Sequence, residues 1–320
     1  MNCTKIKLNG RYLYKDNHYY FFNGGSGFSF KMKGESFSVS FESSPGRGYF
    51  YIILDKNYEN KIKVGTSGLS YVYTFKDTRL HYVDIVKANE SNDNVFKLLD
   101  FKVNGELLDY DFNYSKRIKV YGDSTIAGFG ILKHNGYGSI DNSDSVRDFC
   151  FRALYELNTD FDLFSASGWG LAGSIYTSPN DVGIIDFIDK VAVNKNDSWI
   201  DNTNYDLLIV SLGTNDNSYI QDDPAFLKER IEEFKQAYKK LIDFEFNKNP
   251  DLKILMVYGT LKEENVYYLI EETYEYLKLF YRNLFIHKFN GDNTAISNHA
   301  YVDAHDKMAE ELKAVIKSIL

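Results

Sequence analysis

The sequence of 320 residues lacks the features that mark several classes of protein. It holds only two cysteines, Cys3 and Cys150, which are far apart and form neither a metal-ligand pair nor a disulfide framework. No run of about 18 apolar residues is present that could span a membrane. The N-terminal stretch also lacks the apolar segment of a secretory signal. We therefore expect a water-soluble chain that stays in the cytoplasm as written, or that is the mature form of a secreted protein.

Motifs for several kinds of ligand are missing as well. The net charge is −8 and no Lys/Arg cluster suits a phosphate backbone, so we expect no nucleic-acid partner. No Gly-x-Ser-x-Gly elbow occurs, which argues against an α/β-hydrolase. His287, His299 and His305 are irregularly spaced, without a pair at i and i+4. We predict no metal site and no cofactor.

Aromatic residues, by contrast, are abundant, with 26 Tyr and 24 Phe. Over residues 1–112, short segments of alternating apolar and polar residues, such as Phe37-Ser38-Val39-Ser40-Phe41, are separated by turn signals such as Asn23-Gly24-Gly25. This pattern predicts a β-sandwich, and specifically a jelly roll, without helices. We expect most of its Tyr and Phe in the core and not on a sugar-binding surface.

Beyond Lys116, apolar strands alternate with longer helical stretches, which predicts a parallel sheet covered on both faces over residues 113–320. The connection around residues 111–115 is short, so we expect the two domains to pack together. The predicted strands are 118–121, 161–164, 207–212, 254–258 and 284–287, and the predicted helices are 145–157, 181–191, 224–246, 263–281 and 306–319.

Polar blocks follow the first three of these strands. Gly122-Asp123-Ser124 follows the first, Gly168 the second and Gly213-Thr214-Asn215-Asp216 the third, while Asp303-Ala304-His305 precedes the last predicted helix. Because ligands bind at the carboxyl edge of an open α/β sheet, we expect these blocks to converge on one crevice.

The convergence of these residue types has a chemical meaning. A serine hydroxyl becomes a good nucleophile when a base takes its proton, and histidine is the natural base near neutral pH. We predict Ser124 as the nucleophile and His305 as its base. The Ser124 N–H, the Gly168 N–H and the Asn215 side chain would stabilise the oxyanion. Gly168 could instead only permit a turn, with Gly170 as the donor, and Asn215 could cap a helix.

Three other residues in or beside these blocks also have expected roles. We expect Asp123 and Asp216 to brace their own loops. Trp169 is a candidate for the substrate pocket, because sugars stack on aromatic faces, and equally a candidate for the core.

The four blocks in this order resemble the SGNH (GDSL-type) hydrolases, over roughly residues 116–320. A β-sandwich ahead of such a domain is similar to carbohydrate esterase family 2, the acetylxylan-esterase type. Local strings such as Gly122-Asp-Ser-Thr-Ile-Ala-Gly-Phe-Gly130 resemble it too. The resemblance implies a flavodoxin-like catalytic domain. It also implies removal of acetyl groups from an acetylated oligo- or polysaccharide of xylan or mannan type. The lack of a long apolar run separately predicts no membrane partner.

The resemblance does not decide which group orients the histidine of the site. Many SGNH enzymes carry an acid three residues before the histidine, where this chain has Val302, and the nearest acid is Asp303. Asp303 could orient His305 or cap the last helix, and in the latter case a backbone carbonyl would orient the histidine in a Ser-His dyad. An SGNH acetyltransferase, a lipase-like esterase and an inactive carbohydrate-binding protein remain as alternatives.

Overall fold

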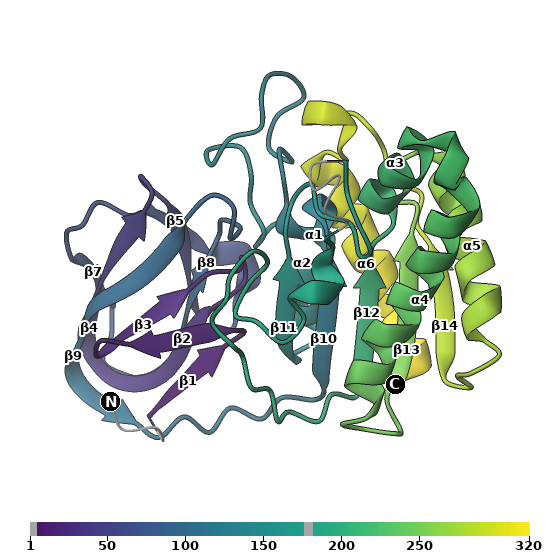
Figure 1. Ribbon diagram of the computed structural model, residues 1–320. Helices are drawn as coiled ribbons and strands as arrows, with labels where there is room; N and C mark the ends of the chain where they lie inside the picture. Colours follow the sequence, from purple (N-terminus) through teal and green to yellow (C-terminus); the bar gives the residue numbers. More distant parts are fainter. Residues whose placement is uncertain (1–4, 176–181) are drawn as a thin grey trace.

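The structure is a computed structural model that describes residues 5–175 and 182–320, so Cys3 and Asp181 lie outside the described residues. Figure 1 shows an antiparallel β part at the N-terminal end of the chain and a parallel sheet with helices at the C-terminal end. Among the described residues, no helix combines the length and the apolar character needed to cross a lipid bilayer.

The N-terminal part consists of nine antiparallel strands. They are β1 (Ile6–Asn9), β2 (Tyr12–Lys15), β3 (His18–Phe21), β4 (Gly27–Ser44), β5 (Tyr49–Leu54), β6 (Ile62–Gly65), β7 (Tyr71–Thr74), β8 (Leu80–Lys87) and β9 (Val95–Leu108).

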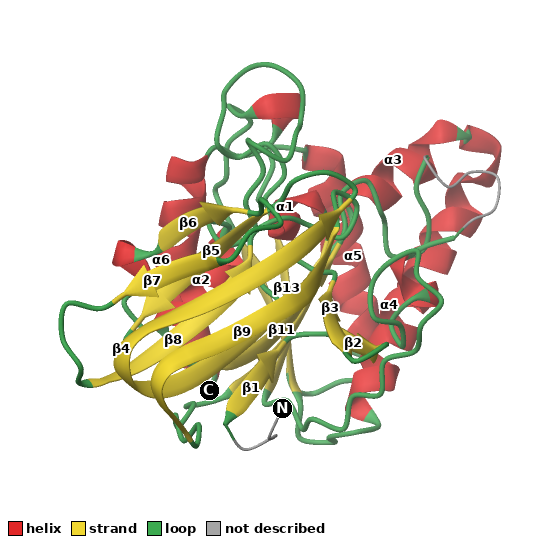
Figure 2. Cartoon of the chain, turned by 90° about the vertical axis from the view of Figure 1, so that its left-hand side faces the viewer, coloured by secondary structure: helices red, strands yellow, loops and turns green. Residues whose placement is uncertain are grey.

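Two long strands, β4 and β9, give this part its curvature. They pair with each other from Lys31 to Ser44 and bend across the sheet (Figure 2). Their alternate residues point inward, so that Phe37, Val39 and Phe41 join an aromatic core. The predicted β-sandwich is confirmed, and its described residues contain no α-helix.

The C-terminal part alternates strands and helices as predicted. Its strands are β10 (Arg117–Gly122), β11 (Asp160–Ser165), β12 (Leu207–Ser211), β13 (Lys253–Tyr258) and β14 (Leu284–Lys288). Its helices are α1 (Ser124–Ala127), α2 (Phe149–Glu156), α3 (Thr214–Asp222), α4 (Leu227–Phe246), α5 (Glu264–Leu277) and α6 (Val302–Ile319).

The five parallel strands follow the order β11-β10-β12-β13-β14, which is the flavodoxin-like order. Alternate residues of each strand enter different cores. Leu208 of β12 packs in the core that α3, α4 and α5 cover. Ile209 packs in the core that α2 and α6 cover. Both faces of the sheet are therefore buried, which explains the nearly continuous apolar strands.

The predicted helices differ from the structure at several places. The helix predicted over 145–157 spans only Phe149–Glu156, and α3 follows β12 where no helix is predicted. Residues 182–191 contain only a short 3-10 turn, Ile184–Asp186, in place of a helix. The last helix begins at Val302 and not at Asp306. The earlier start of α6 moves His305 from a loop into a helix, with consequences for the site.

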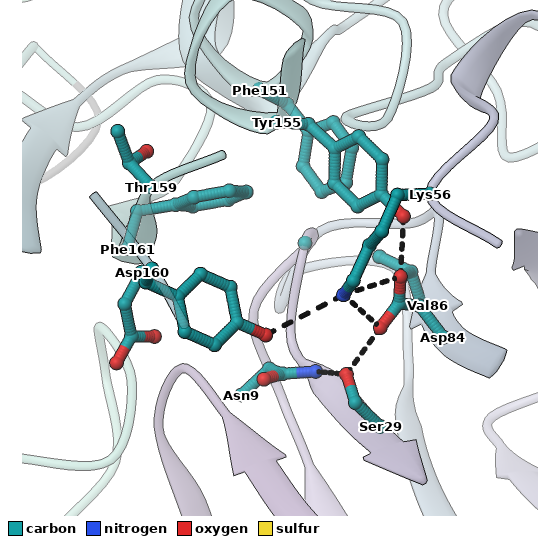
Figure 3. A pocket seen from close by; sticks show the side chains of 12 residues that line it. Asn9, Ser29, Lys56, Asp84, Val86, Phe151, Tyr155, Thr159, Asp160 and Phe161 are labelled. Carbon is teal, nitrogen blue, oxygen red and sulfur yellow. Dashed lines mark hydrogen bonds and ion pairs between the residues drawn. The ribbon is translucent and has the colours of Figure 1, made fainter. Parts of the chain in front are cut away.

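The two parts contact each other at several places, and Figure 3 shows one of them, a pocket lined by residues of both parts. Lys56 Nζ of the sandwich lies 2.8 and 2.9 Å from the two carboxylate oxygens of Asp84. The Tyr155 hydroxyl of α2 donates to the same carboxylate. Apolar residues of both parts, including Val86 and Phe151, belong to one buried cluster. The sandwich is therefore packed against the α/β part, as the short connection predicts.

Candidate active site

The ends of three neighbouring strands bring the polar blocks together. Gly122, the last residue of β10, pairs with Ser165 of β11 on one side and with Ser211 of β12 on the other. The segments that carry Ser124, Gly168 and Asn215 therefore leave the same edge of the sheet, where α1 begins (Figure 1).

Ser124 is the first residue of the short helix α1, and its side chain is buried at the strand edge. Asp123 caps this helix by accepting the Thr125 N–H and the Thr125 hydroxyl, each at 3.0 Å. A Cβ atom at Gly122 would lie 2.2 Å from the Ile126 side chain, so the turn requires glycine there. This is the bracing role predicted for Asp123. Burial raises the pKa of its carboxyl to about 6.

The serine is paired with His299. The His299 Nε2 atom lies 2.7 Å from the Ser124 Oγ atom. The Nδ1 atom lies 3.1 Å from the carbonyl oxygens of Ile296 and of Ser297. Carbonyls only accept, so we assign the ring proton to Nδ1, which leaves Nε2 free to accept from the serine. Burial lowers the pKa of His299, which keeps the ring neutral near pH 7.

The backbone ahead of His299 is shaped for this contact. Ser297 and Asn298 both adopt left-handed conformations, with φ of 53° and 60°, which few residues other than glycine occupy. The loop is tied to the segment after α1, because the Ile296 N–H donates to the Lys133 carbonyl at 3.1 Å. Such local strain is concentrated at functional sites.

The structure does not place His305 at the serine, which corrects the sequence prediction. His305 lies in the second turn of α6 and is almost completely buried. Its Nδ1 atom accepts the Phe149 N–H at 3.1 Å and so satisfies a free amide at the start of α2. Burial lowers the pKa of His305 to about 3, so the ring stays neutral.

Asp303 does not orient the histidine of the site. It lies in the first turn of α6 with its side chain exposed. Two backbone carbonyls occupy the position at His299 Nδ1 where a triad would have its acid. The structure therefore matches the dyad arrangement that the sequence left open, with a different histidine.

The other two predicted residues follow β11 and β12: Gly168 lies in the loop after β11, and Asn215 lies in the first turn of α3. Gly168 has a φ of 82°, and neither its N–H nor that of Ser124 makes a hydrogen bond within the described residues. The Asn215 amide donates one hydrogen to the Trp169 carbonyl at 3.1 Å, which leaves its second hydrogen for another acceptor. The same contact links the loop after β11 to α3.

Asp216 and Trp169 lie next to these residues and contact the loop after β11 and the core. The buried Asp216 carboxylate accepts the N–H groups of Leu171 and Ala172 at 2.8 and 2.7 Å, which is the bracing role predicted for it. The Trp169 ring packs partly buried against the main core, with its centroid 5.6 Å from that of Phe187. One part of the ring thus packs on the core while the rest stays exposed, and the pocket role of Trp169 stays a prediction.

Metal-ligand side chains do not gather at this edge. Among the described residues, no group of three or more His, Cys, Asp or Glu side chains is arranged to hold a metal ion.

Comparisons with known proteins agree with this architecture. Residues 8–110 match the family model described as carbohydrate esterase 2 N-terminal. The sandwich is therefore similar to the N-terminal domain of carbohydrate esterase family 2. The predicted resemblance is confirmed for this domain. None of the curated proteins matches the chain by sequence.

Solved structures share the fold over the whole chain. A family two carbohydrate esterase from Clostridium thermocellum in complex with cellohexaose is 22% identical, with 98% of each chain covered and a TM-score of 0.84. An acetyl xylan esterase from Butyrivibrio proteoclasticus is 17% identical, with 99% of this chain and 96% of that chain covered and a TM-score of 0.83. A salicylyl-acyltransferase from a tetracycline biosynthetic pathway is 11% identical, with 98% and 96% covered and a TM-score of 0.69. The predicted fold class, a β-sandwich followed by a flavodoxin-like α/β domain, is confirmed.

Proposed function

We propose that this chain is a serine esterase that removes acetyl groups from O-acetylated carbohydrate. The observation that carries the proposal is the Ser124 Oγ–His299 Nε2 distance of 2.7 Å, with the opposite ring nitrogen held by two carbonyls. A hydroxyl next to an oriented neutral imidazole is an activated nucleophile.

The reaction follows from this arrangement. Ser124 Oγ attacks the acetyl carbonyl carbon while His299 Nε2 takes the hydroxyl proton. The negative oxygen of the tetrahedral intermediate accepts from the N–H groups of Ser124 and Gly168 and from the free hydrogen of Asn215. The intermediate collapses, the C–O bond to the sugar breaks, and His299 gives its proton to the departing sugar oxygen. Water, deprotonated by His299, then releases acetate and restores Ser124.

Carbohydrate is proposed as the alcohol part because of the relatives. The N-terminal domain is similar to that of carbohydrate esterase family 2. Among structures with the same fold, one holds cellohexaose and another is named an acetyl xylan esterase. We therefore propose acetylated polysaccharide of xylan or mannan type as the substrate class.

Acyl transfer is the second candidate, since an acyltransferase shares the fold. Both reactions pass through the same acyl-serine and differ only in whether water or another hydroxyl takes the acetyl group. Release of free acetate that does not fall when sugar acceptors are added would favour hydrolysis, and acetylated acceptor would favour transfer.

The test compares the wild-type protein with Ser124→Ala on acetylated xylan and on nitrophenyl acetate. We expect kcat to fall at least about a thousandfold, as for loss of a serine nucleophile, and a fluorophosphonate probe to label only the wild type. Ser318→Ala, which changes an exposed serine near the end of α6, is the matched control. Turnover near the wild-type rate in folded Ser124→Ala, or a preference for octanoyl over acetyl esters, would contradict the proposal.

A further inference from the structure

The sandwich reaches the oxyanion loop through the segment between β8 and β9. Two residues of this segment form hydrogen bonds with the backbone of Ser167, one with its N–H and one with its carbonyl. The Glu90 carboxylate accepts the Ser167 N–H at 2.7 Å. The Asn92 amide donates to the Ser167 carbonyl at 3.0 Å. Both residues come from the N-terminal domain, and Ser167 comes from the α/β part.

The Asn92 contact determines the direction of the next amide. The Ser167 carbonyl and the Gly168 N–H belong to one peptide unit, and a trans peptide is planar with these two groups pointing in opposite directions. The only cis bond among the described residues is Ser44–Pro45, so the 167–168 bond is trans. A carbonyl held toward Asn92 therefore aims the Gly168 N–H away from the sandwich.

The flanking contacts leave this peptide little freedom. Glu90 is buried and fixes the preceding peptide unit through the Ser167 N–H. On the other side, the Ser174 hydroxyl donates to the Gly168 carbonyl at 2.6 Å. Gly168 itself has a φ of 82°, a conformation that glycine adopts without strain. Its N–H is meanwhile left without a partner in the described part of the chain.

We propose that Glu90 and Asn92 are positioning residues that aim the Gly168 N–H at the oxyanion of the acyl-transfer reaction. The proposal rests on the function proposed above and assigns the sandwich a part in catalysis. Oxyanion donors act because they are fixed before the charge develops, so looser support weakens the transition state more than the bound ester.

Glu90 needs only an acceptor oxygen for this role. Burial and the nearby Asp93 raise the pKa of Glu90 to about 7, and both its ionised and its neutral form keep an oxygen that can accept the Ser167 N–H. Glutamine offers the same oxygen on a side chain of the same length. Glu90→Gln is therefore the conservative variant that should restore what Glu90→Ala loses.

The experiment uses the full chain with nitrophenyl acetate and with methylboronic acid, which adds to a serine hydroxyl and places an oxygen in the oxyanion site. We expect Glu90→Ala to lower kcat about ten- to a hundredfold and Asn92→Ala about tenfold, with KM changed less than about threefold. The dissociation constant of the boronate should rise by a similar factor. Glu90→Gln should stay within about threefold of the wild type.

Controls separate positioning from stability and from the proposed function. Glu106→Ala, at an exposed glutamate of β9, should leave every value unchanged. Asn92 is exposed, so its variant should fold even if Glu90→Ala does not. Unchanged kcat and boronate affinity in folded Asn92→Ala and Glu90→Ala would overturn the positioning role while the esterase stands. A wild type that neither hydrolyses the ester nor binds the boronate would overturn the proposed function and this role with it.

Discussion

The nucleophile turn and the histidine loop are built in different ways. Ser124 follows a buried strand directly, with Asp123 and Gly122 fixing the turn within three residues. His299 comes eleven residues after the end of β14 in the sequence, and it is positioned by the left-handed residues Ser297 and Asn298 and by the bond from Ile296 to Lys133. The first residue is placed by local sequence, and the second by tertiary contacts.

This difference explains what the sequence could predict. Strand–helix alternation predicts where β10, β11 and β12 end, so Ser124, Gly168 and Asn215 reach the correct edge. The choice of histidine depended on where the last helix begins. Once α6 starts at Val302, His305 falls in its second turn and its side chain faces α2.

The sequence does contain a signal against His305. It lies three, four and seven residues before Met308, Ala309 and Leu312, which are all buried on one face of α6. This is the spacing of a helix face that packs on a core. A histidine that continues an apolar stripe is a core residue, whereas His299 precedes the stripe.

Other features could not be read from the sequence. The carbonyls that orient His299 have no side-chain signature, because any residue carries a carbonyl. The contacts of Glu90 and Asn92 with Ser167 join residues about 75 positions apart across two domains. The boundary between residues 112 and 113 stays a prediction.

Removal of Asn215 should have the largest effect among the supporting residues of the nucleophile region. We expect Asn215→Ala to lower kcat about a hundredfold with little change in KM, because its free hydrogen bonds the oxyanion mainly in the transition state. Steady-state kinetics on nitrophenyl acetate measure both constants. An effect on KM alone would assign Asn215 to ground-state binding.

The dependence of kcat/KM on pH tests the role of His299 as the base. Only neutral His299 can accept the serine proton, so kcat/KM should fall about tenfold per pH unit below the pKa of His299. Burial lowers that pKa, which places the midpoint of the acid limb below the usual value of a free histidine, about 6.5. Unfolding monitored over the same pH range is the control. A midpoint above pH 7 would contradict a buried neutral base.

Asp303→Asn should have the smallest effect. Its side chain is exposed, and two carbonyls already orient His299, so kcat and the melting temperature should change less than about twofold and about 1 °C. A loss on the order of 10⁴ in kcat, as for a triad acid, would show that Asp303 belongs to the site.

The comparison of the two histidines tests the central claim most directly. An asparagine side chain can take over the hydrogen bond that Nδ1 makes in either histidine. At position 299 its NH₂ group can donate to the carbonyls, and at position 305 its oxygen can accept the Phe149 N–H. We expect His299→Asn to lower kcat at least about a thousandfold with its melting temperature nearly unchanged. His305→Asn should lower the melting temperature, while kcat per folded molecule stays within about fivefold of the wild type. The opposite result, with His305→Asn inactive and His299→Asn active, would contradict the Ser124–His299 pair.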